Sequence, residues 1–402
     1  MVKLAGKKQV NAFAYLLAFT YMASYITRIN FGTVISEMET ATSISRSLLS
    51  LSLTGSFITY GIGQIISGII GDKFSPKKLV SMGFIVTIVM NLLIPLCKSP
   101  YLMLIIWCVN GFAQSLMWPP MVRLMTTLLD DIDYKNAVAK VSYGSSLGTI
   151  AIYFISPVLI SLFNYKAVFI FSAIFGAIAL LVWNKKCVDI DISIPVKKEN
   201  NKKSREYSLF TPLLLLIMVA IILQGLLRDG ITTWMPTYIA DTYNFSNSIS
   251  ILTNVIMPIF SIVCFKLATR LYVTRFTNPL TCAAMFFGIG SMFAISLYFV
   301  TGNNAILSII FSALLTGSMH AVNLMLICML PAFFEKSGNV STVSGVLNSC
   351  TYIGSALSSY GIAYISEKAG WNTTLFLWIA IALLGTAICV VCIKPWRKKF
   401  IS

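Results

Sequence analysis

The sequence predicts an all-α membrane protein with twelve transmembrane helices in two six-helix, pseudo-symmetric halves. Three observations predict this fold class: an apolar composition, twelve apolar runs of membrane-spanning length, and one polar stretch in the middle of the chain. Of the 402 residues, 57% are hydrophobic and only 11% are charged, whereas a soluble domain carries roughly 25% charged residues. Too few charges remain to cover a soluble surface, so the natural solvent of this chain is the lipid bilayer.

The apolar runs follow one another along the whole chain. A transmembrane helix needs about 20 mostly apolar residues. The first six such runs cover residues 12–36, 48–71, 79–97, 101–124, 137–162 and 165–184. The second six cover 211–240, 249–271, 278–301, 304–333, 340–365 and 373–393. The short basic segment before the first run has no small-residue cleavage site, so we expect a first helix and not a signal peptide.

The most polar stretch, residues 185–210, separates the two sets of runs. It contains seven basic residues, namely Lys185, Lys186, Lys197, Lys198, Lys202, Lys203 and Arg205. We therefore expect an N-terminal six-helix half over 1–184, a cytoplasmic linker over 185–210, and a C-terminal six-helix half over 211–402. Two similar halves related by an axis along the membrane normal are a known architecture of transporters.

The positions of the charges predict the orientation. The net charge is +16, and the 30 lysines and arginines lie mostly in short clusters between the apolar runs. With a cytoplasmic N-terminus, the loops on the outer side contain only Arg46, Lys98, Lys166 and Lys368. This is the positive-inside pattern, so both termini are expected in the cytoplasm and the chain in the inner or plasma membrane. The basic clusters are not interleaved with aromatic residues, so nucleic acid is not an expected partner.

Two arginines lie inside predicted spans, Arg28 in the first and Arg228 in the seventh. An arginine in a span costs at least ~2.5 kcal/mol and cannot lose its proton, so each must face the interior and find an anion. The two occupy comparable places in the two halves and would converge on one cavity in a two-fold arrangement. The planar guanidinium fits phosphate or carboxylate in a bidentate manner. The alternative is that each arginine pairs with a protein carboxylate or with carbonyl groups.

Asp229 directly follows Arg228. On a helix, the side chains of adjacent residues point about 100° apart. Asp229 can therefore pair across to another helix or carry a proton, and we favour a structural partner.

Other polar residues in the spans allow both a functional and a packing interpretation. Tyr21 and Tyr25 precede Arg28 by seven and three residues, so all three share a helix face. His320, the only histidine, lies in the tenth span. It can change charge near neutral pH, but it can equally be a packing residue.

Gly144 and Gly148 have the small-residue spacing that suits close helix packing.

The segment 68–78 between the second and third spans is predicted to act as a conformational latch. Its acid and its cations sit at helix ends, where they can pair across helices and complement helix dipoles.

No nucleotide loop, metal-ligand set or catalytic triad is visible in the sequence. We therefore expect no enzymatic activity, no metal and no cofactor. Cys389 and Cys392 form a C-x-x-C inside the last run and are expected to be buried thiols.

These segments resemble the major facilitator superfamily and, within it, the organophosphate:phosphate antiporters. Four motifs carry the resemblance, which extends over nearly the whole chain: Gly-Asp-Lys-x-Ser-Pro-Lys-Lys (71–78), Arg-Ile-Asn-Phe (28–31), Trp-Pro-Pro-x-x-Arg (118–123) and Leu-Arg-x-Gly-Ile-x-x-Trp-x-Pro-Thr-Tyr (227–238). The resemblance implies exchange of a phosphorylated metabolite for inorganic phosphate by alternating access. Arg28 and Arg228 would bind the phosphoryl group.

The resemblance also implies further site residues. Substrate contacts are expected at Tyr21, Tyr25, Tyr60, Gln64, Trp118, Trp234, His320 and Tyr352. Gating is expected at Gly68, Asp72, Lys73, Pro76, Lys77 and Arg123. Gln64 stands where the family's glycerol-phosphate transporter has a lysine, and Ser145 where it has a histidine, so the cavity is expected to be less basic.

Two other functions stay open at this point. The first is a proton-coupled importer of a carboxylate or other organic anion, in which Asp229 and His320 would carry the protons. The second is a non-transporting membrane sensor of phosphate esters. In each case the expected partners are a small anionic molecule and the lipid bilayer, and the protein is expected to be a monomer.

Overall fold

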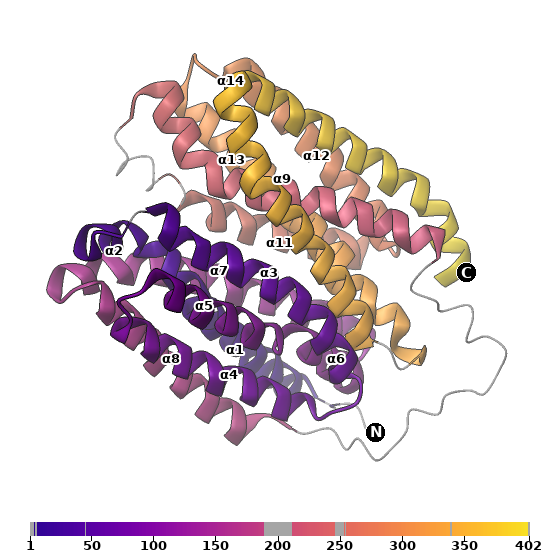
Figure 1. Cartoon of the computed structure of the whole chain (residues 1–402). Coiled ribbons are helices and arrows are strands. Elements are labelled where there is room, and N and C mark those ends of the chain that lie inside the picture. The colour runs from indigo at the N-terminus through magenta and orange to yellow at the C-terminus, as the bar shows by residue number, and fades with distance from the viewer. Residues whose placement is uncertain are drawn as a thin grey trace. The chain divides into compact units, whose positions relative to one another are not determined.

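The computed structural model describes residues 4, 6–44, 46–188, 211–245, 253, 255–337 and 340–400. These residues are helical, with no β-strand among them (Figure 1). They form two compact units, the first from Met1–Lys202 with Phe334–Ser349 and the second from Lys203–Phe333 with Cys350–Ser402. Most of the predicted linker lies outside the described residues, and the division at 185–210 stays a prediction.

The first unit contains most of the N-terminal helices. They are α1 (Lys7–Thr33), α2 (Ile35–Thr42), α3 (Arg46–Gly71), α4 (Pro76–Leu93), the short 3-10 helix η1 (Ile94–Leu96), α5 (Pro100–Ser115), α6 (Trp118–Leu128), α7 (Asp131–Leu162) and α8 (Tyr165–Lys186). α1 packs on α7 and α8, α3 packs on α5, and α4 packs on α8. Polar side chains begin several of these helices: Ser75 Oγ accepts from Lys78 N at 3.2 Å, and Asp130 Oδ1 accepts from Asp133 N at 2.8 Å. Such caps satisfy backbone N–H groups that have no partner within the helix.

The predicted run 101–124 is two helices and not one. α5 ends at Ser115 and α6 begins at Trp118, with two residues between them. Pro119 and Pro120 then lie in the first turn of α6. The first four N–H groups of a helix have no intrahelical partner, so proline is tolerated there. The prolines of the Trp-Pro-Pro motif thus mark a helix start in the middle of the predicted span.

The second unit contains the C-terminal helices. They are α9 (Pro212–Tyr243), α11 (Ile256–Thr274), α12 (Pro279–Val300), α13 (Ala305–Asn323), the π-helix η3 (Leu324–Met329), the 3-10 helix η4 (Leu330–Ser337) and α14 (Val340–Phe400). The predicted run 304–333 is therefore divided among three helix types. α13 packs on α9, α11 and α12.

The helix α14 contains the last two predicted runs. Gly370 interrupts it with φ 78° and ψ 173°, a conformation that glycine adopts without a steric penalty. The chain turns at this glycine between the two runs. The first residues of α14, up to Ser349, belong to the first unit, and the residues from Cys350 onward belong to the second.

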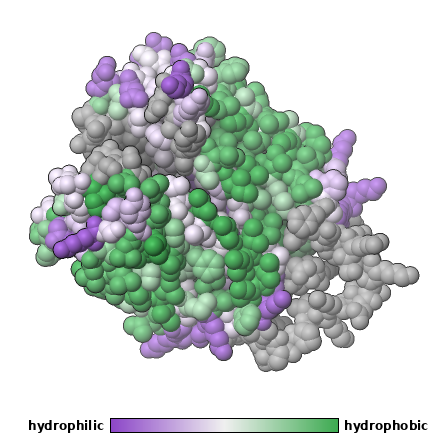
Figure 2. All heavy atoms as spheres, in the orientation of Figure 1, coloured by the Kyte–Doolittle hydropathy of each residue, from purple (hydrophilic) through white to green (hydrophobic). Residues whose placement is uncertain are grey.

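Ten stretches of the described residues are long and apolar enough to cross a membrane. They match all the predicted runs except the first and the eleventh, which lie on α1 and on the first part of α14. α1 is less apolar because it carries Arg28 and several polar side chains that the site uses. On the face shown in Figure 2, hydrophobic residues cover the helix surfaces and hydrophilic residues gather toward helix ends. Many large apolar side chains are exposed, such as Leu181 (70%) and Val391 (64%), as expected for helices that contact lipid.

Candidate functional site

In the first unit, hydrogen bonds between buried polar side chains fix the face of α1 that packs against α4 and α5. Ser24 Oγ donates to Gln114 Oε1 at 2.6 Å, and Gln114 Nε2 donates to Thr27 Oγ1 at 2.8 Å. Asn30 Nδ2 donates to Asn91 Oδ1 at 2.7 Å, and Asn91 Nδ2 donates to Thr27 O at 3.1 Å. Leaving a buried polar group unpaired costs about 1–3 kcal/mol. These bonds to α4 and α5 therefore set the rotation of α1 about its own axis.

The motif Arg-Ile-Asn-Phe is explained by this rotation. Asn30 belongs to the buried hydrogen-bonded face. Next to it, Phe31 packs in the apolar core, with ring centres 5.1 Å from Trp107 and 5.8 Å from Phe169. Arg28 precedes Asn30 by two residues, which is about 200° around a helix. The motif thus anchors one side of α1 and turns its arginine to the other side.

Two tyrosine rings hold the guanidinium of Arg28. Its central carbon lies 4.4 Å from the ring centre of Tyr25 on α1 and 4.8 Å from that of Tyr60 on α3. Both distances are within the range of a cation–π contact. These two contacts help to fix the position of the guanidinium. Arg28 is half-buried, while Tyr60 is buried.

The aromatic contacts continue along α1 to α6. The ring of Tyr21 lies 5.2 Å from that of Tyr25 and 5.1 Å from that of Trp118. The structure therefore brings together five of the residues predicted to contact substrate in one continuous series. The series is Trp118, Tyr21, Tyr25, Arg28 and Tyr60. Their role toward a substrate stays a prediction.

Gln64 and Ser145 are buried and hydrogen-bond to other groups of the protein. Gln64 is fully buried, its Nε2 donates to Ser115 O at 3.3 Å, and its Oε1 accepts from Asn348 at 3.0 Å. Ser145 Oγ donates to Ser142 O within α7 at 2.7 Å. The amide of Gln64 thus ties α3 to α5 and to the start of α14.

The glycines of α7 let it approach α1 closely. A Cβ atom at Gly148 would lie 2.5 Å from Met22 O and 3.0 Å from Tyr25 Cβ, and one at Gly144 would meet Ala18 O. Real Cβ atoms essentially never lie this close to a backbone oxygen. The predicted small-residue packing is therefore present, and it supports the part of α1 that carries Tyr25.

We expect Gly148→Ala to destabilise the protein and to displace Tyr25 from Arg28. Overpacking a close contact costs typically about 1–3 kcal/mol, which should lower the thermal midpoint of the purified protein. Gly32→Ala is the matched control in α1, because a Cβ there meets only Leu53 Cδ1 at 3.7 Å. Equal midpoints for the two variants would show that the α1–α7 contact is not tight.

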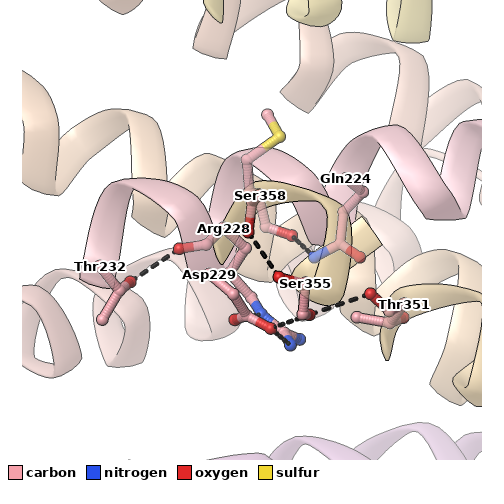
Figure 3. Close-up of polar contacts among 8 residues, drawn as sticks. Gln224, Arg228, Asp229, Thr232, Thr351, Ser355 and Ser358 are labelled. Carbon is pink, nitrogen blue, oxygen red and sulfur yellow. Dashed lines mark hydrogen bonds and ion pairs between the residues drawn. The ribbon is translucent and has the colours of Figure 1, made fainter. Parts of the chain in front are cut away.

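In the second unit, Arg228 and Asp229 form a bidentate ion pair on α9 (Figure 3). Arg228 Nε lies 2.6 Å from Asp229 Oδ1, and Nη2 lies 2.8 Å from Oδ2. The expectation that these side chains point apart is wrong, because the long arginine side chain bends back to its neighbour. Asp229 also accepts a hydrogen bond from Ser355 Oγ on α14. Asp229 therefore forms its ion pair with a residue of its own helix. Its hydrogen bond to another helix comes from the hydroxyl group of Ser355.

Further contacts position this pair. Thr232 Oγ1 donates to Arg228 O at 2.7 Å, and Gln224 Nε2 donates to Met319 O on α13 at 3.1 Å. His320 follows Met319, and its ring meets Phe265 edge-on at 5.6 Å. The bond from Gln224, which lies one turn before Arg228 on α9, therefore joins this helix to the residue next to His320.

The remaining predicted substrate residues of the second unit are Trp234 and Tyr352. Both are half-buried, Trp234 on α9 and Tyr352 on α14 next to Thr351. The sequence did not reveal the π-helix η3, which packs against α9 and contains Cys328. Single-turn π-segments occur frequently at functional sites.

The predicted latch segment caps a helix. Asp72, after the end of α3, accepts from the backbone N–H groups of Ser341 at 2.9 Å and Thr342 at 2.8 Å, and from Thr342 Oγ1 at 2.6 Å. A carboxylate at a helix N-terminus satisfies unpaired N–H groups and complements the helix dipole. Burial raises the pKa of Asp72, and the hydrogen bonds from Thr342 and Ser341 oppose this rise.

Arg123 on α6 and Lys77 of the segment bind carbonyl groups at or just after helix ends. Arg123 donates to Gly71 O at 2.5 Å and to Phe74 O at 3.4 Å, and Lys77 Nζ donates to Cys187 O at 2.8 Å. Lys73 is exposed. Cations are stabilised near helix C-termini by the dipole. These bonds fix the turn from which Asp72 reaches α14.

Two other residues of the segment have structural roles. Pro76 follows the cap residue Ser75 at the first position of α4. Gly68 allows a close approach to α14, because a Cβ there would lie 2.8 Å from Ser341 O and 3.3 Å from Gly345 Cα. The contact between α3 and the first turns of α14 therefore combines a cap with backbone packing.

Comparisons with known proteins bear on the family and the fold of this chain. Residues 17–359 match the Major Facilitator Superfamily. A probable hexose phosphate transport protein of Chlamydia muridarum is 22% identical over 92% of this chain and 88% of its own. The glycerol-3-phosphate transporter of Bacillus subtilis is 24% identical over 91% of this chain and 88% of its own.

A solved structure shows the same fold. The proton:xylose symporter has a TM-score of 0.77 at 11% identity, covering 99% of this chain and 97% of its own. The predicted fold class and the resemblance are confirmed. The chain belongs to the Major Facilitator Superfamily, has the fold of that family's multi-pass membrane transporters, and is related to the sugar-phosphate and glycerol-phosphate transporters.

Proposed function

We propose that this protein is a secondary active transporter that exchanges a phosphorylated metabolite for inorganic phosphate by alternating access. The observation that carries the proposal is Arg28, a charged side chain on a membrane helix held between the rings of Tyr25 and Tyr60. Such a charge is costly in a membrane and marks a functional site by default. A guanidinium binds a phosphoryl group through two parallel hydrogen bonds.

The relatives support the substrate class. Two that align over most of this chain are named for the transport of hexose phosphate and of glycerol 3-phosphate. We propose Arg28 in the first unit and Arg228 in the second as the phosphoryl-binding residues. Tyr21, Tyr25 and Tyr60 would position Arg28 and offer hydroxyl groups to substrate oxygens.

The contact between Asp72 and the first turn of α14 is the proposed latch. Three hydrogen bonds to one carboxylate form a compact contact that either exists or is broken. In alternating access, such a contact forms in one state and opens in another. Arg123 and Lys77 would hold the turn of Asp72 in place through both states.

A proton-coupled importer of an organic anion is the second candidate. The observation that favours it is the location of two titratable groups in the second unit: Asp229 pairs with Arg228, and His320 follows Met319, whose carbonyl accepts a hydrogen bond from Gln224 one turn before Arg228. Groups of this kind in membrane helices form proton relays in many transporters. The two candidates differ in substrate chemistry and in the driving force.

A ligand screen on the purified protein tests the substrate class. A ligand that binds only the folded state raises its stability in proportion to the logarithm of ligand concentration. We expect phosphate esters and inorganic phosphate to raise the thermal midpoint, and dicarboxylates to leave it unchanged. Stabilisation by dicarboxylates alone would contradict the proposal and support the importer.

The orientation of the chain gives a separate prediction. The positive-inside pattern places residue 200 in the cytoplasm and the turn at Asn303, between α12 and α13, outside. In a background without cysteine, a membrane-impermeant thiol reagent added to cells should label Asn303→Cys and miss Asn200→Cys. The reverse pattern would invert the proposed topology.

A further inference from the structure

The Arg228–Asp229 pair occupies donors that the proposed function assigns to the substrate. Nε and Nη2 of a guanidinium form an edge that binds carboxylate or phosphoryl groups through two parallel bonds. Asp229 fills this edge, with one oxygen on each nitrogen at 2.6 and 2.8 Å. A ligand anion can take the same edge only when Asp229 leaves it.

The pair lacks the geometry of a brace between helices. Both residues belong to α9, and adjacent residues on a helix do not naturally face each other. Breaking the pair therefore separates no two helices. The side chains are also accessible in part, with 13% of Arg228 and 29% of Asp229 exposed. An incoming anion can thus reach the pair without unpacking the unit.

The carboxylate has a second partner that can retain it. Ser355 on α14 donates to Asp229 Oδ2 (Figure 3). Gly354, next to Ser355, packs closely against the backbone of α9 at Leu226. The position of Ser355 is therefore fixed by helix packing and does not depend on Arg228. A carboxylate released by Arg228 would keep one hydrogen bond.

We propose that Asp229 is a built-in competitor of the substrate at Arg228, an inference that rests on the proposed function. In the empty protein, Asp229 holds the guanidinium in its binding geometry. The anionic group of the substrate displaces it, and Ser355 retains the displaced carboxylate. A phosphoryl dianion competes with one carboxylate more strongly than a monoanion does, because its charge is doubled. Asp229 is in this way a specificity-determining residue that selects strongly charged ligands.

The test measures binding of inorganic phosphate and of glycerol 3-phosphate to the purified full chain by titration calorimetry. Asp229→Asn keeps the size of the side chain and an acceptor for Ser355 but removes the competing charge. We expect its Kd to fall about tenfold, the effect of one charge-assisted hydrogen bond. The gain should vanish when Arg228→Gln is added, because no guanidinium is left to compete for. Asp241→Asn, at the end of the same helix, is the matched control and should bind like wild type.

A second variant keeps the inference testable if Asp229→Asn does not fold. Ser355 donates to Asp229 in both states, but its bond is stronger when the carboxylate has lost the guanidinium and carries its full charge. Ser355→Ala therefore costs the displaced state more than the paired state, and we expect weaker binding of both probes. Unchanged binding by Ser355→Ala would overturn the inference.

Two further outcomes separate this inference from the proposed function. If Asp229→Asn binds no more tightly while Arg28→Lys still weakens binding, Asp229 is structural and the proposed function stands. If wild type binds neither probe, the proposed function and this inference fall together.

Discussion

Replacing Arg28 with lysine is expected to weaken binding of phosphate esters by one to two orders of magnitude, although the charge is kept. Lysine is a point charge and cannot make two parallel hydrogen bonds to one phosphoryl group. Losing one charge-assisted bond costs about 1.5–3 kcal/mol, which corresponds to roughly one to two decades in Kd. Lysine also loses the planar group that stacks on Tyr25 and Tyr60.

The measurement is titration calorimetry of the purified variant with glycerol 3-phosphate. Arg275→Lys is the control, because Arg275 is an exposed arginine directly after α11. It should bind like wild type. An unchanged Kd for Arg28→Lys would make Arg28 a packing residue and would remove the main support of the proposed function.

Replacing Asp72 with alanine is expected to slow transport at least tenfold while ligand binding persists. The variant loses the acceptor of three hydrogen bonds at the start of α14. Hydrogen bonds to charged groups contribute about 1.5–3 kcal/mol each, and 1.4 kcal/mol already shifts a two-state equilibrium tenfold. The protein would then spend too little time in the state that the latch stabilises.

Transport rate and Kd of this variant should be measured together in the same preparation. Asp131→Ala is the matched control, since Asp131 pairs only at the surface with Lys135 at 3.2 Å and is 81% exposed. Burial raises the pKa of Asp72, so acidification should protonate it earlier than an exposed aspartate and should mimic the variant. Normal transport by Asp72→Ala would show that the capped turn is not a latch.

The sequence predicted the helical runs well because apolar length is a strong signal in a membrane protein. It missed the division of two runs. The break before Trp118 follows from Pro119 and Pro120, which could have been interpreted as a helix start. The π-helix over Leu324–Met329 has no such signal, since its residues are uniformly apolar.

The site shows the same contrast. The arginines and tyrosines could be singled out because charge and aromatic hydroxyl groups are costly or unusual in a span. The hydrogen bonds that Asn91 and Gln114 make to α1 were not predicted. Both are polar side chains inside apolar runs, so the sequence did contain a signal for them. The Arg228–Asp229 pair could not be predicted from helix geometry, because the bend of a long side chain depends on its local surroundings.

Exchange in liposomes tests the central claim most directly. Purified protein is reconstituted, the vesicles are loaded with unlabelled inorganic phosphate, and uptake of radiolabelled phosphate is followed with and without a pH gradient. The account predicts rapid uptake that requires internal phosphate, needs no pH gradient and is lost in Arg28→Lys. Uptake driven by the pH gradient into vesicles without internal phosphate would contradict the account and establish a proton-coupled importer. Absence of uptake by a protein that binds phosphate esters would contradict it too, and would make the protein a sensor.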